Sequence, residues 1–124
     1  MEIRIDRDAS QDVFVVHCPE QMDWNVRDDL AAQVRGFAGQ SAVRGLIVDM
    51  EGVRFINSAG IGALFTTLKY VRESGGAMVV ARAGAPIRRL LDTVNLGRLI
   101  PIVSSLAEAR QAVGSEAKDA RFET

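Results

Sequence analysis

One serine of the chain, Ser58, lies where its hydroxyl could be modified or could act as a nucleophile. It follows Asn57 and precedes an amphipathic pattern that begins with Gly60 and Gly62. Asn57 or Ser58 can cap the expected helix, while two glycines in its first turns cost about 0.5–1 kcal/mol each relative to alanine. The glycines fit either tight packing on a sheet or close approach of another protein's backbone or a phosphate. A phosphoserine here would meet unpaired N–H groups and the positive end of the helix dipole.

As a nucleophile, Ser58 lacks the usual surroundings. The pattern G-x-S-x-G has Ile56 in place of its first glycine, and the single histidine, His17, precedes the serine, whereas α/β-hydrolases place their histidine last. His17 is more simply interpreted as a packed or edge-exposed strand residue, and Cys18 as a small core side chain. We therefore expect no enzymatic activity and no catalytic residue.

The composition removes other classes of function. Fifteen basic and sixteen acidic residues give a formal charge of -1, which argues against a nucleic-acid partner. One cysteine and one histidine exclude a disulfide framework and a multi-cysteine zinc site, so we expect no bound metal. No phosphate-binding glycine loop occurs, because Phe65 replaces the third glycine of a dinucleotide fingerprint, so no cofactor is expected. No signal peptide or spanning segment is found, which predicts a cytoplasmic protein without membrane insertion.

Strand and helix patterns alternate along the chain. Apolar β-branched runs predict strands, and apolar residues at helical spacing, such as Ile61, Leu64, Phe65 and Leu68, predict helices. The expected strands lie at about 3–5, 13–18, 45–50, 77–81 and 99–103, and the expected helices at about 26–37, 58–74, 86–94 and 106–113. Asp23 or Asn25 can cap the first helix, and residues 105–108 match a capping box for the last.

This order predicts an α/β fold with a single domain. The sheet is expected to be mixed and mainly parallel, with an N-terminal β-hairpin and about four α-helices. The domain should span residues 1–113, and residues 114–124 should form a loosely ordered tail. In such sheets, functional sites lie off the carboxyl ends of the strands, which here means the loops at 19–25, 51–58 and 82–85.

Segment 46–62, LIVDMEGVRFINSAGIG, resembles the signature of the STAS domain family, and within it the single-domain anti-sigma factor antagonists (anti-anti-sigma factors). That signature is an apolar strand ending in Asp, a short loop with Val and Phe, an acidic or amide residue, Ser, a small residue, Gly, an aliphatic residue and Gly. The order and length of the elements match the family over about residues 2–113.

The resemblance implies a regulatory binding protein that takes part in partner switching. The unphosphorylated antagonist binds an anti-sigma factor that is also a serine kinase of the histidine-kinase-like ATPase type, and so releases the kinase's other partner. The kinase phosphorylates the motif serine, Ser58 here, which blocks binding, and a PP2C-type phosphatase reverses the modification. The implied partner-binding residues are Met22, Asp23, Trp24, Asn57, Ser58, Ala59, Gly60, Ile61 and Gly62.

Some alternatives stay open at this point. Trp24 could be exposed as an interface anchor or could pack under the first helix. Sporulation-type members have Asp-Ser-Ser-Gly where this chain has Asn57-Ser58-Ala59-Gly60, so a negative charge beside the acceptor is missing. The domain could instead be a ligand or nucleotide sensor, a subunit of a lipid-transport complex, or a serine hydrolase.

Overall fold

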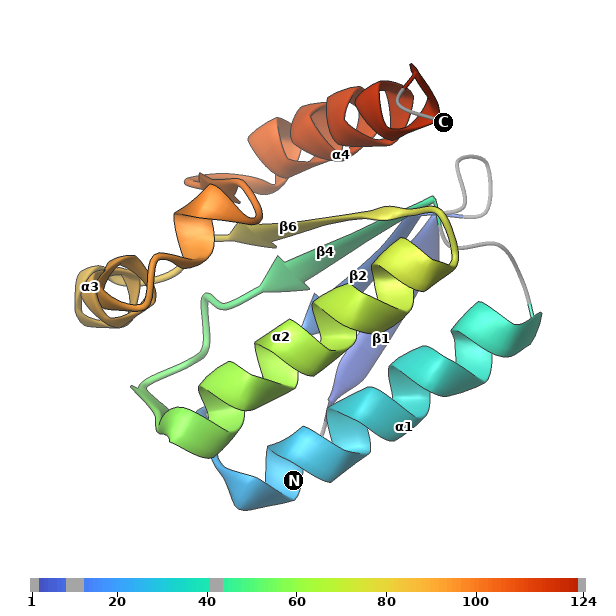
Figure 1. Cartoon of the computed structure of the whole chain (residues 1–124). Coiled ribbons are helices and arrows are strands. Elements are labelled where there is room, and N and C mark those ends of the chain that lie inside the picture. The colour runs from blue at the N-terminus through green and yellow to red at the C-terminus, as the bar shows by residue number, and fades with distance from the viewer. Residues whose placement is uncertain (1–2, 9–12, 41–43, 123–124) are drawn as a thin grey trace.

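Figure 1 shows the computed structural model of the chain, which describes residues 3–8, 13–40 and 44–122. The main sheet consists of β1 (Arg4–Asp8), β2 (Val13–His17), β4 (Gly45–Asp49), β6 (Ala77–Ala81) and β7 (Ile102–Val103). They lie side by side in the order β1-β2-β4-β6-β7, with β1 antiparallel to β2 and all other pairs parallel. The predicted hairpin and the mainly parallel sheet are confirmed.

Helices cover both faces of this sheet. They are α1 (Trp24–Gln40), α2 (Ser58–Glu73), α3 (Ala85–Thr93) and α4 (Leu106–Phe122), with a short 3-10 helix η1 (Leu96–Arg98). Figure 1 shows α1 and α2 side by side on one face and α4 on the other, while α3 lies beyond the carboxyl ends of the central strands. Helix α3 and the N-terminal turns of α1 and α2 thus lie at the edge of the sheet where the central strands end.

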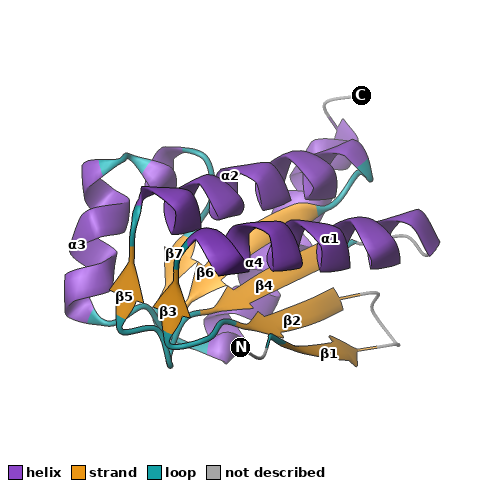
Figure 2. Ribbon diagram, turned by 90° about the horizontal axis from the view of Figure 1, so that it is seen from below, coloured by secondary structure: helices purple, strands orange, loops and turns teal. Residues whose placement is uncertain are grey.

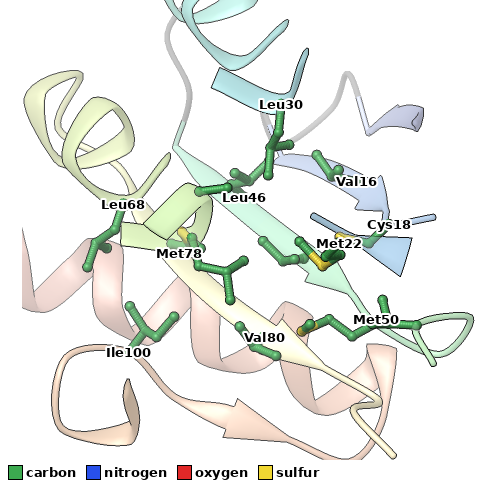
Figure 3. Close-up of a cluster of buried hydrophobic side chains, with 14 of the residues drawn as sticks. Val16, Cys18, Met22, Leu30, Leu46, Met50, Leu68, Met78, Val80 and Ile100 are labelled. Carbon is green, nitrogen blue, oxygen red and sulfur yellow. The ribbon is translucent and has the colours of Figure 1, made fainter. Parts of the chain in front are cut away.

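The alternation of side chains along the strands divides the core in two. Val16, Leu46, Val48, Met78 and Val80 belong to the larger cluster beneath α1 and α2, which Figure 3 shows in close-up. The intervening strand residues face α4, in a smaller cluster that includes Val13, Val15, Ile47, Val79, Ala81, Ala109 and Val113. The central strands are thus buried on both faces, as continuous apolar runs predict.

Three features differ from the sequence prediction. Two further strands, β3 (Gln21–Met22) and β5 (Phe55–Ile56), form a separate two-stranded sheet within segments that the sequence indicated as loops. The expected strand at 99–103 is shortened to β7, because the N–H groups of Leu99 and Ile100 both donate to the carbonyl oxygen of Leu96 in η1. Helix α4 continues to Phe122, beyond its expected end at about residue 113, through a stretch whose polar residues show no apolar periodicity.

Candidate functional site

A short ladder brings together the two segments that contain the predicted site residues. Met22 of β3 pairs with Ile56 of β5 in parallel register, next to the pair Gln21–Phe55. The amide N–H of Asn57 donates to the carbonyl oxygen of Met22 at 3.2 Å, which extends the ladder by one residue. Figure 2 shows β3 and β5 side by side at the start of α1 and α2. The ladder therefore fixes where both helices begin.

Asn57 caps helix α2, which decides between Asn57 and Ser58, the two caps that the sequence allowed. Its backbone is extended, its Oδ1 accepts a hydrogen bond from the N–H of Gly60 at 3.1 Å, and its carbonyl oxygen accepts from Ile61 at 3.0 Å. Ser58 is then the first helical residue, and its side chain is exposed. Because the amide of Asn57 makes the cap, the hydroxyl of Ser58 is presented to solvent without a role in starting the helix.

Asp23 caps helix α1 in the same way. Its Oδ1 accepts a hydrogen bond from the N–H of Asn25 at 3.0 Å, and Asn25 itself lies inside the helix. Trp24 is the first helical residue, and 61% of its surface is exposed, so it does not pack under α1. The question that the sequence left open for this aromatic side chain is settled in favour of exposure.

The two glycines at the start of α2 have different environments. A Cβ atom built on Gly60 would overlap the carbonyl oxygen of Met22 and lie 2.8 Å from Cγ1 of Ile56. A Cβ atom on Gly62 would have no described atom within 4 Å. Gly60 is thus required for tight packing of α2 against β3, whereas Gly62 leaves an open, partly exposed spot on the helix.

Several of the residues predicted to bind a partner are buried and support the fold instead of lying at the surface. The side chain of Met22 is completely buried in the main core, so the expectation that it faces a partner is wrong. Ala59 and Gly60 are also buried, and Gly60 packs directly against Met22 of β3. The predicted residues that reach solvent at least in part are Asp23, Trp24, Asn57, Ser58, Ile61 and Gly62, which we call the Ser58 surface.

A second exposed aromatic residue at this end of the molecule was missed by sequence reasoning. Phe55 has half of its surface exposed, while its neighbour Ile56 is buried. This alternation is that of a strand, but a strand of two residues gives too short a pattern to be recognised. Together with Trp24, Phe55 leaves more apolar surface exposed near Ser58 than the sequence indicated.

A group of charged side chains lies where β2, β4 and β6 end, and it also was missed. Asp49, which is 4% exposed, accepts hydrogen bonds from Arg82 through both carboxylate oxygens, at 3.0 and 2.6 Å. Its Oδ2 lies 2.8 Å from Nδ1 of His17, and its Oδ1 accepts from the N–H of Glu51 at 3.1 Å. Burial alone would raise the pKa of Asp49, but the hydrogen bonds from Arg82, Glu51 and His17 outweigh it and lower the pKa below its ordinary value.

The backbone of Arg82 is unusual. Its φ of 60° lies in the left-handed region, which costs a residue with a Cβ atom about 1 kcal/mol or more. The position lies directly after β6, in one of the loops where the sequence predicted a site.

His17 and Cys18, the two side chains that could have acted in a hydrolase, are held by other interactions. The ring nitrogens of His17 lie 2.8 Å from a carboxylate oxygen of Asp49 and 2.9 Å from one of Asp6. Cys18 is buried, and burial, with a smaller contribution from the negative charge of Asp49, raises the pKa of its thiol to about 12. Both residues therefore take part in the packing and charge pairing of the strand ends.

Other possible binding features lie outside the Ser58 surface. A groove of about 450 Å³ runs along α2, and its lining residues all belong to that helix: Phe65, Leu68, Lys69, Arg72 and Glu73.

Among the described residues, no group of three histidine, cysteine or acidic side chains is placed to hold a metal ion. In the same part of the chain, no helix is long and apolar enough to cross a membrane.

Comparison with known proteins identifies a family to which the chain is similar. The family model described as STAS domain matches residues 4–109 of the chain. Among curated proteins, an anti-sigma F factor antagonist from Paenibacillus polymyxa is 23% identical over 109 residues, which cover 88% of this chain and 93% of that protein.

Solved structures show the same fold. The anti-sigma factor antagonist SpoIIAA in its unphosphorylated form has a TM-score of 0.78 at 17% identity, covering 92% of this chain and 97% of that one. The Bacillus cell fate determinant SpoIIAA in the phosphorylated form has a TM-score of 0.70 at 16% identity, covering 89% and 97%. At these identities, the comparison establishes the single-domain architecture with four helices and a mixed, mainly parallel sheet.

Proposed function

The chain belongs to the STAS domain family, and from that premise we propose that it is an anti-sigma factor antagonist switched by phosphorylation of Ser58. In its unphosphorylated form it binds an anti-sigma factor that is also a serine kinase of the histidine-kinase-like ATPase type. This binding releases the kinase's other partner. Phosphorylation of Ser58 blocks the binding, and a PP2C-type phosphatase restores it, all in the cytoplasm.

The observation that carries this proposal is the placement of Ser58. Its side chain is exposed at the first position of α2, while Asn57 supplies the helix cap. A kinase can therefore modify the hydroxyl without removing a hydrogen bond that holds the helix start. The names of the similar proteins support the same role, since they are called anti-sigma factor antagonists and SpoIIAA is known in a phosphorylated form.

The surroundings of Ser58 explain how one phosphate could control binding. Trp24 is exposed and Ile61 and Gly62 partly so, which provides an apolar and smooth contact area. A phosphate adds about −1.5 to −2 charges to a chain whose formal charge is -1. Docking would then have to desolvate that charge against apolar neighbours, which opposes binding while the fold stays intact.

We further propose that the protein is not an enzyme. Both ring nitrogens of His17 are within hydrogen-bond distance of carboxylates, so the chain's one histidine is not available as a base for Ser58. A fluorophosphonate probe should therefore leave the protein unlabelled, whereas labelling that disappears in Ser58→Ala would support a serine hydrolase instead.

The modification is tested by intact-mass analysis after incubation with the cognate kinase and ATP. One phosphate is expected on the wild-type chain and none on Ser58→Ala. Ser104→Ala, which alters another exposed serine, is the matched control and should gain one phosphate. A phosphate that persists in Ser58→Ala would place the acceptor elsewhere.

The effect on binding is tested by isothermal titration with the same kinase. Ser58→Asp should bind at least about tenfold more weakly than Ser58→Ala, which corresponds to about 1.4 kcal/mol. Similar unfolding curves of the two variants would show that the difference arises at the contact surface. Equal affinities would contradict the proposed switch.

A further inference from the structure

Three parallel strands end in register at the carboxyl edge of the main sheet. His17 of β2 lies opposite Asp49 of β4, and Asp49 lies opposite Ala81 of β6. The residue after Ala81 is Arg82, whose guanidinium turns to Asp49. A charged cluster therefore forms at the point from which the chain leaves the sheet toward Ser58 and toward α3.

Asp49 is the centre of this cluster. Its two carboxylate oxygens accept two hydrogen bonds from Arg82 and one from the N–H of Glu51. One of these oxygens, Oδ2, also lies 2.8 Å from Nδ1 of His17. The third nitrogen of the Arg82 guanidinium, Nη1, lies 2.6 Å from a carboxylate oxygen of Glu51. Arg82 thus holds the end of β4 and also the first turn of the segment that follows it.

That segment, residues 50–57, connects β4 to helix α2 and is anchored at both ends. At its far end, the N–H groups of Arg54 and Phe55 both donate to the carbonyl oxygen of Glu20, and β5 pairs with β3. At its near end, the side chains of Asp49 and Arg82 supply hydrogen bonds beyond those of the backbone. The path of the chain to Ser58 therefore depends on Arg82.

The backbone at Arg82 indicates that this side chain is needed at its position. A φ of 60° is favourable for glycine and unfavourable for arginine. The unfavourable backbone is accompanied by a bidentate pair with a buried carboxylate, a geometry that arginine provides and lysine does not.

We infer that Arg82, acting through Asp49 and Glu51, is a positioning residue that holds segment 50–57 in the conformation that presents Ser58 to its kinase. The inference rests on the proposed function for its biochemical effect. Its structural part, the fixing of segment 50–57, can be measured separately.

The test compares variants of Arg82 with a core variant on the opposite face of the sheet. Arg82→Gly removes the guanidinium and suits the left-handed backbone, and Arg82→Lys keeps the charge without the bidentate pair. Val113→Ala removes buried volume between α4 and the sheet and controls for a general loss of stability. The readouts are kcat/KM for phosphorylation of Ser58 and the rates of amide hydrogen exchange at Glu51 and Val53.

Arg82→Gly should lower kcat/KM about tenfold and speed exchange at Glu51 and Val53 about tenfold, because a displaced loop misplaces the reacting hydroxyl. Arg82→Lys should recover part of both losses, and Val113→Ala should leave both near the wild-type values. Unchanged phosphorylation in Arg82→Gly, or an equal loss in Val113→Ala at a comparable urea midpoint, would overturn the inference.

The two proposals can fail separately. A wild-type chain that the kinase does not phosphorylate would contradict the proposed function, and hydrogen exchange would then decide the role of Arg82. Faster exchange at Glu51 and Val53 in Arg82→Gly alone would still show that Arg82 fixes this segment, while unchanged exchange would refute it. If Arg82→Gly does not fold, Arg82→Lys carries the same test with a smaller expected effect in the same direction.

Discussion

Trp24 and Ser58 occupy equivalent positions on two neighbouring segments of the fold. Each is the first residue of its helix, and each lies two residues beyond a paired position of the β3–β5 ladder, since Met22 pairs with Ile56. Neighbouring strands lie about 4.8 Å apart, so the ladder brings the exposed tryptophan to the side of the proposed phosphate acceptor. The Ser58 surface is thus built by two helix starts held in register.

This arrangement predicts that Trp24 anchors the kinase. Trp24→Ala should weaken binding about tenfold or more, because an exposed aromatic side chain beside Ser58 would become buried in the complex. Its free energy of unfolding should change by less than about 0.5 kcal/mol, as the side chain lies mostly in solvent. Isothermal titration measures the first effect and urea unfolding the second.

The control for this prediction is Gln33→Ala, an exposed position further along α1 that should bind as the wild type does. Trp24 is the single tryptophan of the chain, so its fluorescence also reports the contact directly. Its emission should shift to shorter wavelength when the kinase binds. Wild-type affinity of Trp24→Ala would exclude this residue from the interface.

The two glycines of α2 predict opposite effects of the same substitution. Gly60→Ala should destabilise the fold by about 1–3 kcal/mol, because its methyl group would overlap the carbonyl oxygen of Met22. Gly62→Ala should stabilise it by up to about 1 kcal/mol, because alanine favours a helix and the space is open. Urea midpoints measured side by side would show the difference, and equal midpoints would contradict the close packing of α2 on β3.

The central strands of the main sheet and the helices could be predicted from the sequence because each is long enough to show an apolar run or a helical period. The runs at Val13–His17, Gly45–Asp49 and Ala77–Ala81 read as buried strands, and they are the central strands of the sheet. The sequence also limited the cap of α2 to Asn57 or Ser58, since a cap depends on the residue type directly before an apolar pattern, and the structure shows Asn57. Local signals were therefore sufficient for the architecture and for the start of α2.

The remaining features depend on contacts between distant segments. Strands β3 and β5 have two residues each, which is too short for a pattern, and their pairing buries Met22, a residue that was expected at the surface. The cluster of His17, Asp49 and Arg82 exists because three strands end in register. A sequence reading that aligned the ends of the predicted parallel strands could have suggested that His17 and Asp49 are neighbours.

The ionisation of Asp49 predicts a dependence of stability on acid. Its pKa in the folded chain is lowered, so the charged form stabilises the fold above the ordinary pKa of about 4, and this contribution is lost as the pH falls through the folded value. Asp49→Asn should be less stable than the wild type by about 2 kcal/mol at pH 5, because Arg82 loses a charged partner.

That difference should shrink as the pH falls from about 4, where Asp49 of the unfolded chain takes up a proton, through the lowered pKa of the folded carboxylate. Urea unfolding of both proteins between pH 5 and pH 2.5 measures it. Glu51→Gln, at an exposed partner of Arg82, serves as the control and should differ little from the wild type at any pH. A constant difference between Asp49→Asn and the wild type would contradict the lowered pKa.

The thiol of Cys18 should be unreactive in the folded protein. Burial raises its pKa to about 12, so very little thiolate is present at pH 8, and the sulfur is also shielded from reagents. Reaction with Ellman's reagent should be at least about a hundredfold slower in buffer than in 6 M urea. Comparable rates in the two solutions would show that the strand end opens readily.

The two outer strands of the main sheet also limit how the protein can associate. Outer strands offer unpaired backbone groups to other chains, and charged side chains or short length reduce that tendency. Here β1 exposes Arg4, Asp6 and Arg7, and β7 has two residues that follow Pro101. The sheet is therefore protected against growth by added strands, so the chain should have little tendency to aggregate along its edges.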